Sequence, residues 1–331
     1  MKRITRLMTA AVLGALVLGG CSSNGQGGAA GGASAAPAAG AEAGGDGGTF
    51  AVITHGAPGD SFWDVVKNGA EAAGKQYGAT VTYQGDGDPA KQAQLLDQAI
   101  SQKVDGVVVS MANPDALRES ITKAVSAGIP VVTVNSGAAE SKEFGAITHV
   151  GQSEEVAGRG AGEKLKAEGV TKLLCVIHEA GNVGLDQRCN GATATLGGTV
   201  ERLQVDVSNL ADATSKIKAK LQADASVDGV LTLNPAVAVA ARDAIADGGS
   251  KAKLATFDLS ADVVDAIGAD EILFAVDQQQ YLQGWLPITF LELYRKNLNT
   301  VGGGLPVNTG PGFVTKENAQ QVAKLAQSGT R

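Results

Sequence analysis

The chain has 331 residues and a formal charge of −7, with 27 Lys and Arg against 34 Asp and Glu. Because phosphate contacts need clustered Lys and Arg, an acidic chain without a basic run is a poor nucleic-acid binder, and we expect no nucleic-acid partner. The same charge disfavours adsorption on anionic lipid. Beyond residue 48, no apolar stretch approaches the roughly 20 residues that a membrane-spanning helix needs.

The first 48 residues predict export. A basic start at residues 2–6 precedes a mostly apolar run over 7–18, which is too short to span a membrane and is typical of a secretory signal. The run ends in Leu18-Gly19-Gly20-Cys21, which resembles a bacterial lipobox. This implies that residues 1–20 are removed and that Cys21 becomes the lipidated first residue. Residues 21–48 are mostly Gly, Ala and Ser, which favours a flexible tether of about 30 Å. The alternative is an uncleaved signal with an incidental cysteine.

Export bears on the remaining cysteines and on location. Removal of residues 1–20 takes away three positive charges and moves the formal charge from −7 to −10. An oxidising compartment favours a disulfide between Cys175 and Cys189, the two cysteines left after lipidation. The alternative is two buried free thiols. We expect an extracytoplasmic protein that contacts the cell membrane only through its lipid anchor.

Short β-branched runs alternate with amphipathic segments through the rest of the chain. Runs such as 107–109 lack in/out alternation, which suits a parallel sheet covered on both faces. Strand–helix alternation with short joints predicts a doubly wound, Rossmann-like α/β fold. About 280 residues follow the tether. A single hydrophobic core usually serves fewer residues than this, so two such lobes are expected. The expected strands are Phe50–Thr54, Ala79–Gln84, Gly106–Ser110, Val131–Asn135, Ile147–Gly151, Lys172–His178, Val200–Val207, Gly229–Leu233, Leu254–Asp258 and Ile272–Asp277. The expected helices are Ser61–Tyr77, Lys91–Gln102, Asp115–Ala127, Glu154–Ala167, Leu185–Leu196, Asp212–Ala223, Ala236–Asp247 and Tyr281–Lys296.

Polar side chains follow most of the expected strands. In doubly wound sheets, ligands bind outside the carboxyl ends of the strands. Each such residue could instead cap the following helix, as Asp, Asn and Ser commonly do. Taken as a set, they favour a polar cleft between two facing lobes. They are the segment His55 to Asp60, Ser110, Asn135-Ser136, Gln152, His178-Glu179, Asn234, Asp258 and Asp277-Gln278.

Several short segments follow one another in a characteristic order. They are Ser61-Phe62-Trp63 with Lys67-Asn68-Gly69-Ala70, then Asp105–Val109, Ala127–Val132, Thr256-Phe257-Asp258, and Asp277–Gln280 before Gly284. In order and spacing they resemble the ribose-binding protein family, type I periplasmic binding proteins that serve sugar ABC importers, here in lipoprotein form. The resemblance begins at Phe50 and implies two interleaved lobes, residues 49–150 plus 281–307 and residues 151–280 plus 308–331. It also implies a three-crossing hinge near Gly151-Gln152, Asp277-Gln278 and Val307-Asn308.

The resemblance also implies ligand contacts. The matching positions are Asp60, Phe62, Trp63, Ser110, Arg188, Asn234, Asp258 and Gln278. One departure is clear. Ribose binders carry an Asp-Arg pair after the fourth strand, where this chain has Asn135-Ser136-Gly137, so ribose itself becomes a doubtful ligand.

The chemistry of these side chains favours a neutral, hydroxyl-rich ligand. Carboxylates accept hydrogen bonds, Arg188 donates in a fork, and amides do both, which matches sugar hydroxyls. The carboxylates are those of Asp60, Asp258 and Asp277, and the amides those of Asn135, Asn234 and Gln278. Phe62 and Trp63 would stack on a pyranose face, although either could simply pack into the core. Hexose, pentose, sugar alcohol and inositol all remain open.

Other functions have weaker support. No G-x-S-x-G, HExxH or phosphate-cradling GxxxxGK[ST] motif occurs, and we expect no catalytic residue, cofactor or metal. A glycoside hydrolase using Glu179 and Asp258 is a less favoured alternative. A sugar or signal sensor on the same fold is another, which a neighbouring histidine kinase gene would favour over a permease and ATPase. We expect a monomer that closes over its ligand and then docks on ABC permease subunits.

Overall fold

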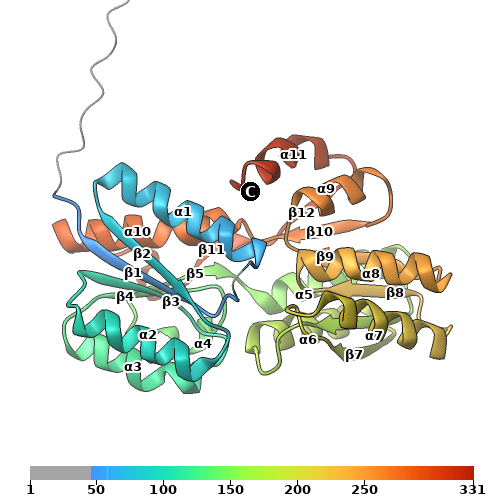
Figure 1. Cartoon of the computed structure of the whole chain (residues 1–331), viewed down its shortest axis with the longest axis horizontal. Coiled ribbons are helices and arrows are strands. Elements are labelled where there is room, and N and C mark those ends of the chain that lie inside the picture. The colour runs from blue at the N-terminus through green and yellow to red at the C-terminus, as the bar shows by residue number, and fades with distance from the viewer. Residues whose placement is uncertain (1–45, 58) are drawn as a thin grey trace, which may run out of the picture. The chain divides into compact units, whose positions relative to one another are not determined.

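The computed structural model describes residues 46–57 and 59–331 (Figure 1). The predicted signal peptide, Cys21 and most of the predicted tether lie outside the described residues. The last tether residues contact the folded body, since the backbone N–H of Gly48 donates to Glu292 at 3.2 Å. Within the described residues, no helix combines the length and apolar character needed to cross a bilayer.

The strands form two separate six-stranded sheets, one in each lobe. The first sheet has the order β11-β5-β4-β3-β1-β2, and the second has the order β12-β10-β9-β8-β6-β7. All strand pairs are parallel except β10 with β12. The first sheet comprises β1 (Thr49–Thr54), β2 (Thr80–Gly85), β3 (Gly106–Ser110), β4 (Val131–Val134), β5 (Thr148–Gln152) and β11 (Val307–Gly310). The second comprises β6 (Lys172–Ile177), β7 (Thr199–Gln204), β8 (Gly229–Thr232), β9 (Lys253–Phe257), β10 (Phe274–Asp277) and β12 (Gly312–Thr315).

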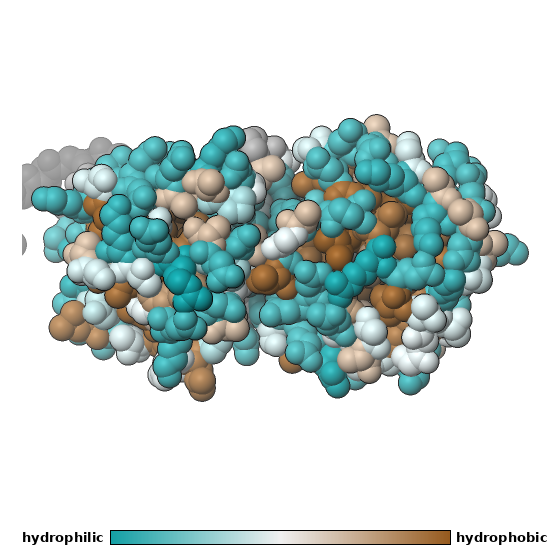
Figure 2. All heavy atoms as spheres, turned by 90° about the horizontal axis from the view of Figure 1, so that it is seen from below, coloured by the Kyte–Doolittle hydropathy of each residue, from teal (hydrophilic) through white to brown (hydrophobic). Residues whose placement is uncertain are grey.

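Helices cover both faces of each sheet, which explains the apolar runs in the strands. Val107 and Val109 pack toward one face, whereas Val108 packs toward the other, and all three are fully buried. The first lobe contains α1 (Ser61–Tyr77), α2 (Pro89–Ser101), α3 (Pro114–Ser126), α4 (Ala138–Ser141), α10 (Gln280–Asn297) and the 3₁₀ turn η1 (Gly302–Gly304). The second contains α5 (Glu154–Ala167), α6 (Val183–Leu196), α7 (Leu210–Ala223), α8 (Pro235–Gly248), α9 (Ala261–Gly268) and α11 (Ala319–Gln327). On the face shown in Figure 2, hydrophilic residues surround the apolar patches of both lobes.

The predicted doubly wound α/β fold with two lobes is confirmed. Every expected strand and helix is present, with its ends within three residues of the expected ones. The sequence analysis did not predict α4, α9, α11, β11 or β12. The two strands read Val-Asn-Thr-Gly and Gly-Phe-Val-Thr, and their Val and Thr residues are interrupted by Asn and Gly and form no run that marks a strand.

The chain crosses between the lobes three times. The first crossing follows β5, and the second lies between β10 and α10. The third lies at Pro311, a few residues beyond the expected Val307-Asn308. Its position follows from strand pairing, because Gly310 pairs with Gln152 in the first sheet and Gly312 pairs with Asp277 in the second.

The predicted disulfide is present in the second lobe. Cys175 of β6 and Cys189 of α6 are bonded to each other, and both are fully buried. The bond ties the strand to the helix that follows it, one residue from Arg188.

Candidate ligand-binding site

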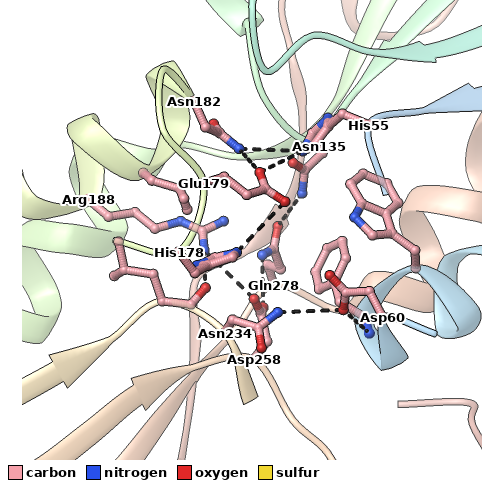
Figure 3. A pocket seen from close by; sticks show the side chains of 14 residues that line it. His55, Asp60, Asn135, His178, Glu179, Asn182, Arg188, Asn234, Asp258 and Gln278 are labelled. Atoms are coloured by element: carbon pink, nitrogen blue, oxygen red, sulfur yellow. Dashed lines mark hydrogen bonds and ion pairs between the residues drawn. The ribbon is translucent and has the colours of Figure 1, made fainter. Parts of the chain in front are cut away.

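Side chains from both lobes line one cavity at the carboxyl ends of the two sheets (Figure 3). The space among the lining atoms amounts to about 290 Å³, part of it open to solvent. The lining residues are His55, Asp60, Phe62, Trp63, Asn135, His178, Glu179, Asn182, Leu185, Arg188, Leu233, Asn234, Asp258 and Gln278.

The start of α1 supplies an aromatic wall with an acceptor beside it. Asp60 is the N-cap residue of α1 and accepts from the Phe62 backbone N–H at 3.0 Å. Phe62 and Trp63 follow in the first turn, with ring centroids 4.9 Å apart and planes at 80°. Burial raises the pKa of Asp60 to about 6, against the lowering effect of the Phe62 N–H. Both rings therefore line the cavity and also pack on each other.

His55 faces the cavity from the end of β1, and Ser110 fixes its ring. The Ser110 hydroxyl oxygen lies 2.7 Å from His55 Nδ1 and accepts from the His55 backbone N–H at 2.9 Å. The hydroxyl keeps its proton and a second lone pair, so it can donate to Nδ1 or accept from it, and both ring tautomers fit this contact. Burial lowers the pKa of His55, so the ring is neutral.

Arg188 enters the cavity from α6 and is held by a carboxylate of α5. Its Nε lies 2.6 Å and its Nη2 3.0 Å from the two oxygens of Glu154, a bidentate pair. Nη1 donates to the Leu233 carbonyl at 3.3 Å and lies 3.7 Å from Asp258. Burial opposes the charge on Arg188, but the adjacent carboxylates outweigh it and raise its pKa. The guanidinium is thus charged and fixed before any ligand arrives.

A chain of amides and a carboxyl runs across the floor of the cavity. Asn135 Nδ2 donates to Gln278 Oε1 at 3.2 Å, and Gln278 Nε2 donates to Asp258 Oδ1 at 2.8 Å. Asn135 directly follows β4 and Asp258 directly follows β9, in opposite lobes, and both adopt left-handed backbone conformations, with φ of 64° and 71°. Non-glycine residues with such angles concentrate at functional sites. Burial raises the pKa of Asp258 to about 7, against the lowering effect of Arg188.

Direct contacts join the lobes around the cavity. Asn234 Nδ2 lies 3.5 Å from Asp60 Oδ1, and Asn182 Nδ2 lies 3.4 Å from His55 Nε2. Asn182 also donates to Glu179 at 2.6 Å, and Glu179 lies 3.7 Å from His55 Nε2. These contacts show that the described arrangement brings the two halves of the site together.

Eight of the ten sequence-predicted ligand residues line this cavity, and two do not. Ser110 lies behind His55 and also contacts Gln92, whose Nε2 donates to the Ser110 carbonyl at 2.8 Å. Asp277 is fully buried and is bonded to Arg331 at 2.7 Å, outside the lining. The eight that line the cavity are Asp60, Phe62, Trp63, Asn135, Arg188, Asn234, Asp258 and Gln278.

Other residues line the cavity as well, and the sequence carried a signal for some. His55, His178 and Glu179 belong to the strand-end set that predicted a polar cleft, although they were not among the ten predicted ligand residues. Asn182 could have been found as the N-cap of α6, where it accepts from the Gly184 N–H at 3.0 Å. Nothing in the sequence marked Leu185 or Leu233 apart from ordinary core residues. Among residues 46–57 and 59–331, no three His, Cys, Asp or Glu side chains gather closely enough to hold a metal ion.

Two doubly wound lobes, three crossings and a shared polar cavity define a type I periplasmic binding protein. Residues 50–297 match the periplasmic binding protein domain, and the chain belongs to that family.

Relatives include a carbohydrate transporter from Acidothermus cellulolyticus, solved in complex with myo-inositol. It is 43% identical, covers 86% of this chain and 100% of its own, and has a TM-score of 0.85. A solute-binding protein from Agrobacterium vitis with bound D-fucose is 26% identical, covers 84% and 99% of the two chains, and has a TM-score of 0.75. The xylose/arabinose-binding protein of Sulfolobus acidocaldarius is 24% identical over 68% of this chain and 60% of its own length. This chain thus spans less than two thirds of that relative.

Proposed function

We propose that this protein is the solute-binding component of a carbohydrate ABC importer and that it binds a neutral monosaccharide or cyclitol between its lobes. The observation that carries the proposal is the cavity itself. Its wall combines carboxyl, guanidinium, amide and imidazole groups with the Phe62–Trp63 pair. A ring that bears many hydroxyls can donate to and accept from such groups while its C–H face rests on an aromatic ring.

The charges in the cavity favour an uncharged ligand. Arg188, the one Lys or Arg in the lining, is already paired with Glu154. An anion would meet no free cation among the lining residues and would approach Glu179 and Asp258. A polyol needs only hydrogen bonds and places no charge beside the carboxylates of the lining.

Myo-inositol is the first ligand to try. The relative from Acidothermus cellulolyticus was solved in complex with it, and that protein shares 43% identity over 86% of this chain. Hexoses and pentoses have the same donor and acceptor pattern and belong in the same panel.

Binding would be coupled to closure of the lobes. Asp60, His55 and Asn135 belong to the first lobe, whereas Arg188, Asn234 and Asp258 belong to the second. A ligand that contacts both sets binds the closed form better than any open form, and it shifts the equilibrium by that difference in affinity. The closed surface would then dock on the permease subunits of the importer.

The protein would act outside the cytoplasm on a lipid anchor. Its family is that of periplasmic binding proteins, and the sequence that precedes the described residues has the pattern expected of an export signal, followed by the lipobox-like Leu18–Cys21. Labelling cells with a fatty-acid analogue should mark the wild-type protein but not a Cys21→Ala variant. Equal labelling of both would contradict the assignment of Cys21.

A thermal-shift screen tests the proposal. The panel contains myo-inositol, neutral hexoses and pentoses, sugar alcohols and uronates, and at least one neutral member should raise the melting temperature. Incubation with chromogenic glycosides should give no turnover, since the proposed protein binds without reacting. Turnover that depends on Glu179 or Asp258 would favour the hydrolase instead.

A further inference from the structure

We propose that Glu154, which lies outside the cavity lining, is a positioning and specificity-determining residue: it holds Arg188 in place and cancels its charge, so the site rejects anionic sugars. The inference rests on the proposed function and deepens it. Arg188 touches the cavity and Glu154 does not, so the role of Glu154 is exerted through Arg188.

The contact between the two side chains is close and almost free of solvent. Their side-chain exposures are 4% for Arg188 and 3% for Glu154. Both carboxylate oxygens are used, one by Nε at 2.6 Å and the other by Nη2 at 3.0 Å. Gln152 Nε2 donates to the same carboxylate at 2.9 Å, so Glu154 is itself fixed from behind. A bidentate pair in this setting defines both the position and the plane of the guanidinium.

The packing of α5 on α6 makes the contact possible. A Cβ atom on Gly158 would lie 2.1 Å from the Arg188 carbonyl oxygen, and one on Gly191 would lie 2.3 Å from the Glu155 carbonyl oxygen. Only glycine permits such a close approach of the two helices. Glu154 is the first residue of α5, where the helix N-terminus favours a carboxylate. The fold therefore brings this carboxylate to Arg188.

The pairing decides what Arg188 offers a ligand. A guanidinium has five N–H groups, and three are taken by Glu154 and the Leu233 carbonyl. The others remain as donors for ligand hydroxyls. The positive charge is already shared with Glu154, so a ligand carboxylate would gain little from it and would still lose its hydration. Asp258, 3.7 Å from Arg188, feels both members of the pair: burial raises its pKa most, Arg188 lowers it, and Glu154 raises it.

The test measures selectivity in Glu154→Gln. Titration calorimetry gives dissociation constants for two matched pairs, glucose with glucuronate and galactose with galacturonate. The ratio of uronate to neutral affinity should rise at least about tenfold in the variant, because Arg188 regains an unshared charge. Each ratio is taken within one protein, so a lower folded fraction cancels. The double variant Glu154→Gln with Asp258→Asn should raise the ratio further, since Asp258 can otherwise take over part of the pairing.

Glu155→Gln is the matched control. Glu155 is the next residue of α5, its side chain is 64% exposed, and it faces Arg159. The ratio of uronate to neutral affinity in Glu155→Gln should equal that of the wild type. An unchanged ratio in both Glu154 variants, or the same rise in the control, would overturn the inference.

A measurement without ligand keeps this inference separate from the proposed function. Carbon-13 NMR can follow the titration of the Asp258 carboxyl in wild type and Glu154→Gln. The midpoint should fall in the variant, because Asp258 then loses the repulsion of Glu154 and faces an Arg188 charge that is no longer shared. A wild type that binds no neutral ligand contradicts the proposed function, yet this midpoint still decides the role of Glu154. An unmoved midpoint would mean that Glu154 does not compensate Arg188.

Discussion

Asn234 Nδ2 lies 3.5 Å from Asp60 Oδ1, so the N-cap residue of α8 in the second lobe contacts the N-cap residue of α1 in the first. Each side chain caps its own helix while its free polar atoms face the cavity. Asn234 Oδ1 accepts from the Ala236 N–H at 2.8 Å, which leaves Nδ2 to reach across the site. Capping and ligand binding are therefore compatible uses of one side chain here.

Two substitutions of Asp60 separate these uses. Asn is as good an N-cap as Asp and carries no buried charge, so Asp60→Asn should not lower stability but should weaken ligand binding by roughly fivefold, because the charged acceptor becomes neutral. Asp60→Ala should weaken ligand binding and should also lower the free energy of unfolding by about 1 kcal/mol. Chemical denaturation and calorimetry measure the two effects. Asp88 caps α2 outside the cavity lining and serves as the control, since its Ala variant should lose stability alone.

Arg188→Ala should weaken binding of the neutral ligand about ten- to hundredfold, because a hydrogen bond to a charged group contributes roughly 1.5–3 kcal/mol. It should also lower stability, since Glu154 would be left buried without its partner. Arg188→Lys keeps the charge but loses the fork, and should fall between wild type and Ala. Calorimetry on protein shown to be folded gives the comparison. Arg202→Ala is the control: it removes an exposed ion pair with Asp186 and should leave ligand affinity unchanged. If Arg188→Ala also left ligand affinity unchanged, the site would be misassigned.

Asp277 should behave as a structural residue. It is fully buried at the end of β10, and Arg331 binds it through Nε at 2.7 Å and Nη2 at 2.6 Å. Arg331→Ala should lower the melting temperature because a buried carboxylate loses its cation, and adding Asp277→Asn should recover part of the loss. Ligand affinity should change far less than in Arg188→Ala. An Asp277→Asn variant that binds ligand as poorly as Arg188→Ala would instead support the sequence prediction that Asp277 contacts the ligand.

Asp258 gives stability a defined pH dependence. Burial raises its pKa in the folded protein to about 7, whereas the ordinary value is 3.8. Between these values the folded state keeps a proton that the unfolded state has released, so this stabilisation is complete at low pH and is lost as the pH rises toward about 7. Asp258→Asn removes the effect. As the pH rises through this window, the free energy of unfolding of the variant should increase relative to that of the wild type by up to about 1.4 kcal/mol per pH unit.

Urea unfolding at intervals between about pH 4.5 and about pH 7.5 measures that difference. Other titrating groups, such as His178 with its pKa lowered to about 4 by burial, occur in both proteins and largely cancel. A difference that stays flat across the window would show that Asp258 is ionised in the folded state.

The fold could be predicted from the sequence because strands and helices are marked by patterns of neighbouring residues. Runs such as 107–109 can only be buried on both faces, and helices with one apolar stripe must cover them. The third crossing was misplaced because β11 and β12 are defined by their partners. Gly310 and Gly312 join different sheets, and nothing in their own side chains indicates it.

The site was predicted in outline for a related reason. The position of a residue at a strand end follows from the sequence, whereas the direction of its side chain depends on the backbone angle and on distant partners. Asp258 turns into the cavity with a φ of 71°, while Asp277 is held by Arg331, 54 residues away. Glu154 was missed because its role depends on how closely α5 approaches α6. That approach becomes visible only in three dimensions.

Titration calorimetry with myo-inositol and neutral monosaccharides tests the central claim most directly. The account predicts saturable one-site binding for at least one neutral ring, with affinity lost in Arg188→Ala and with each uronate binding less tightly than its neutral counterpart. No measurable heat from any neutral ring, or a uronate that binds more tightly than its neutral counterpart, would contradict the account.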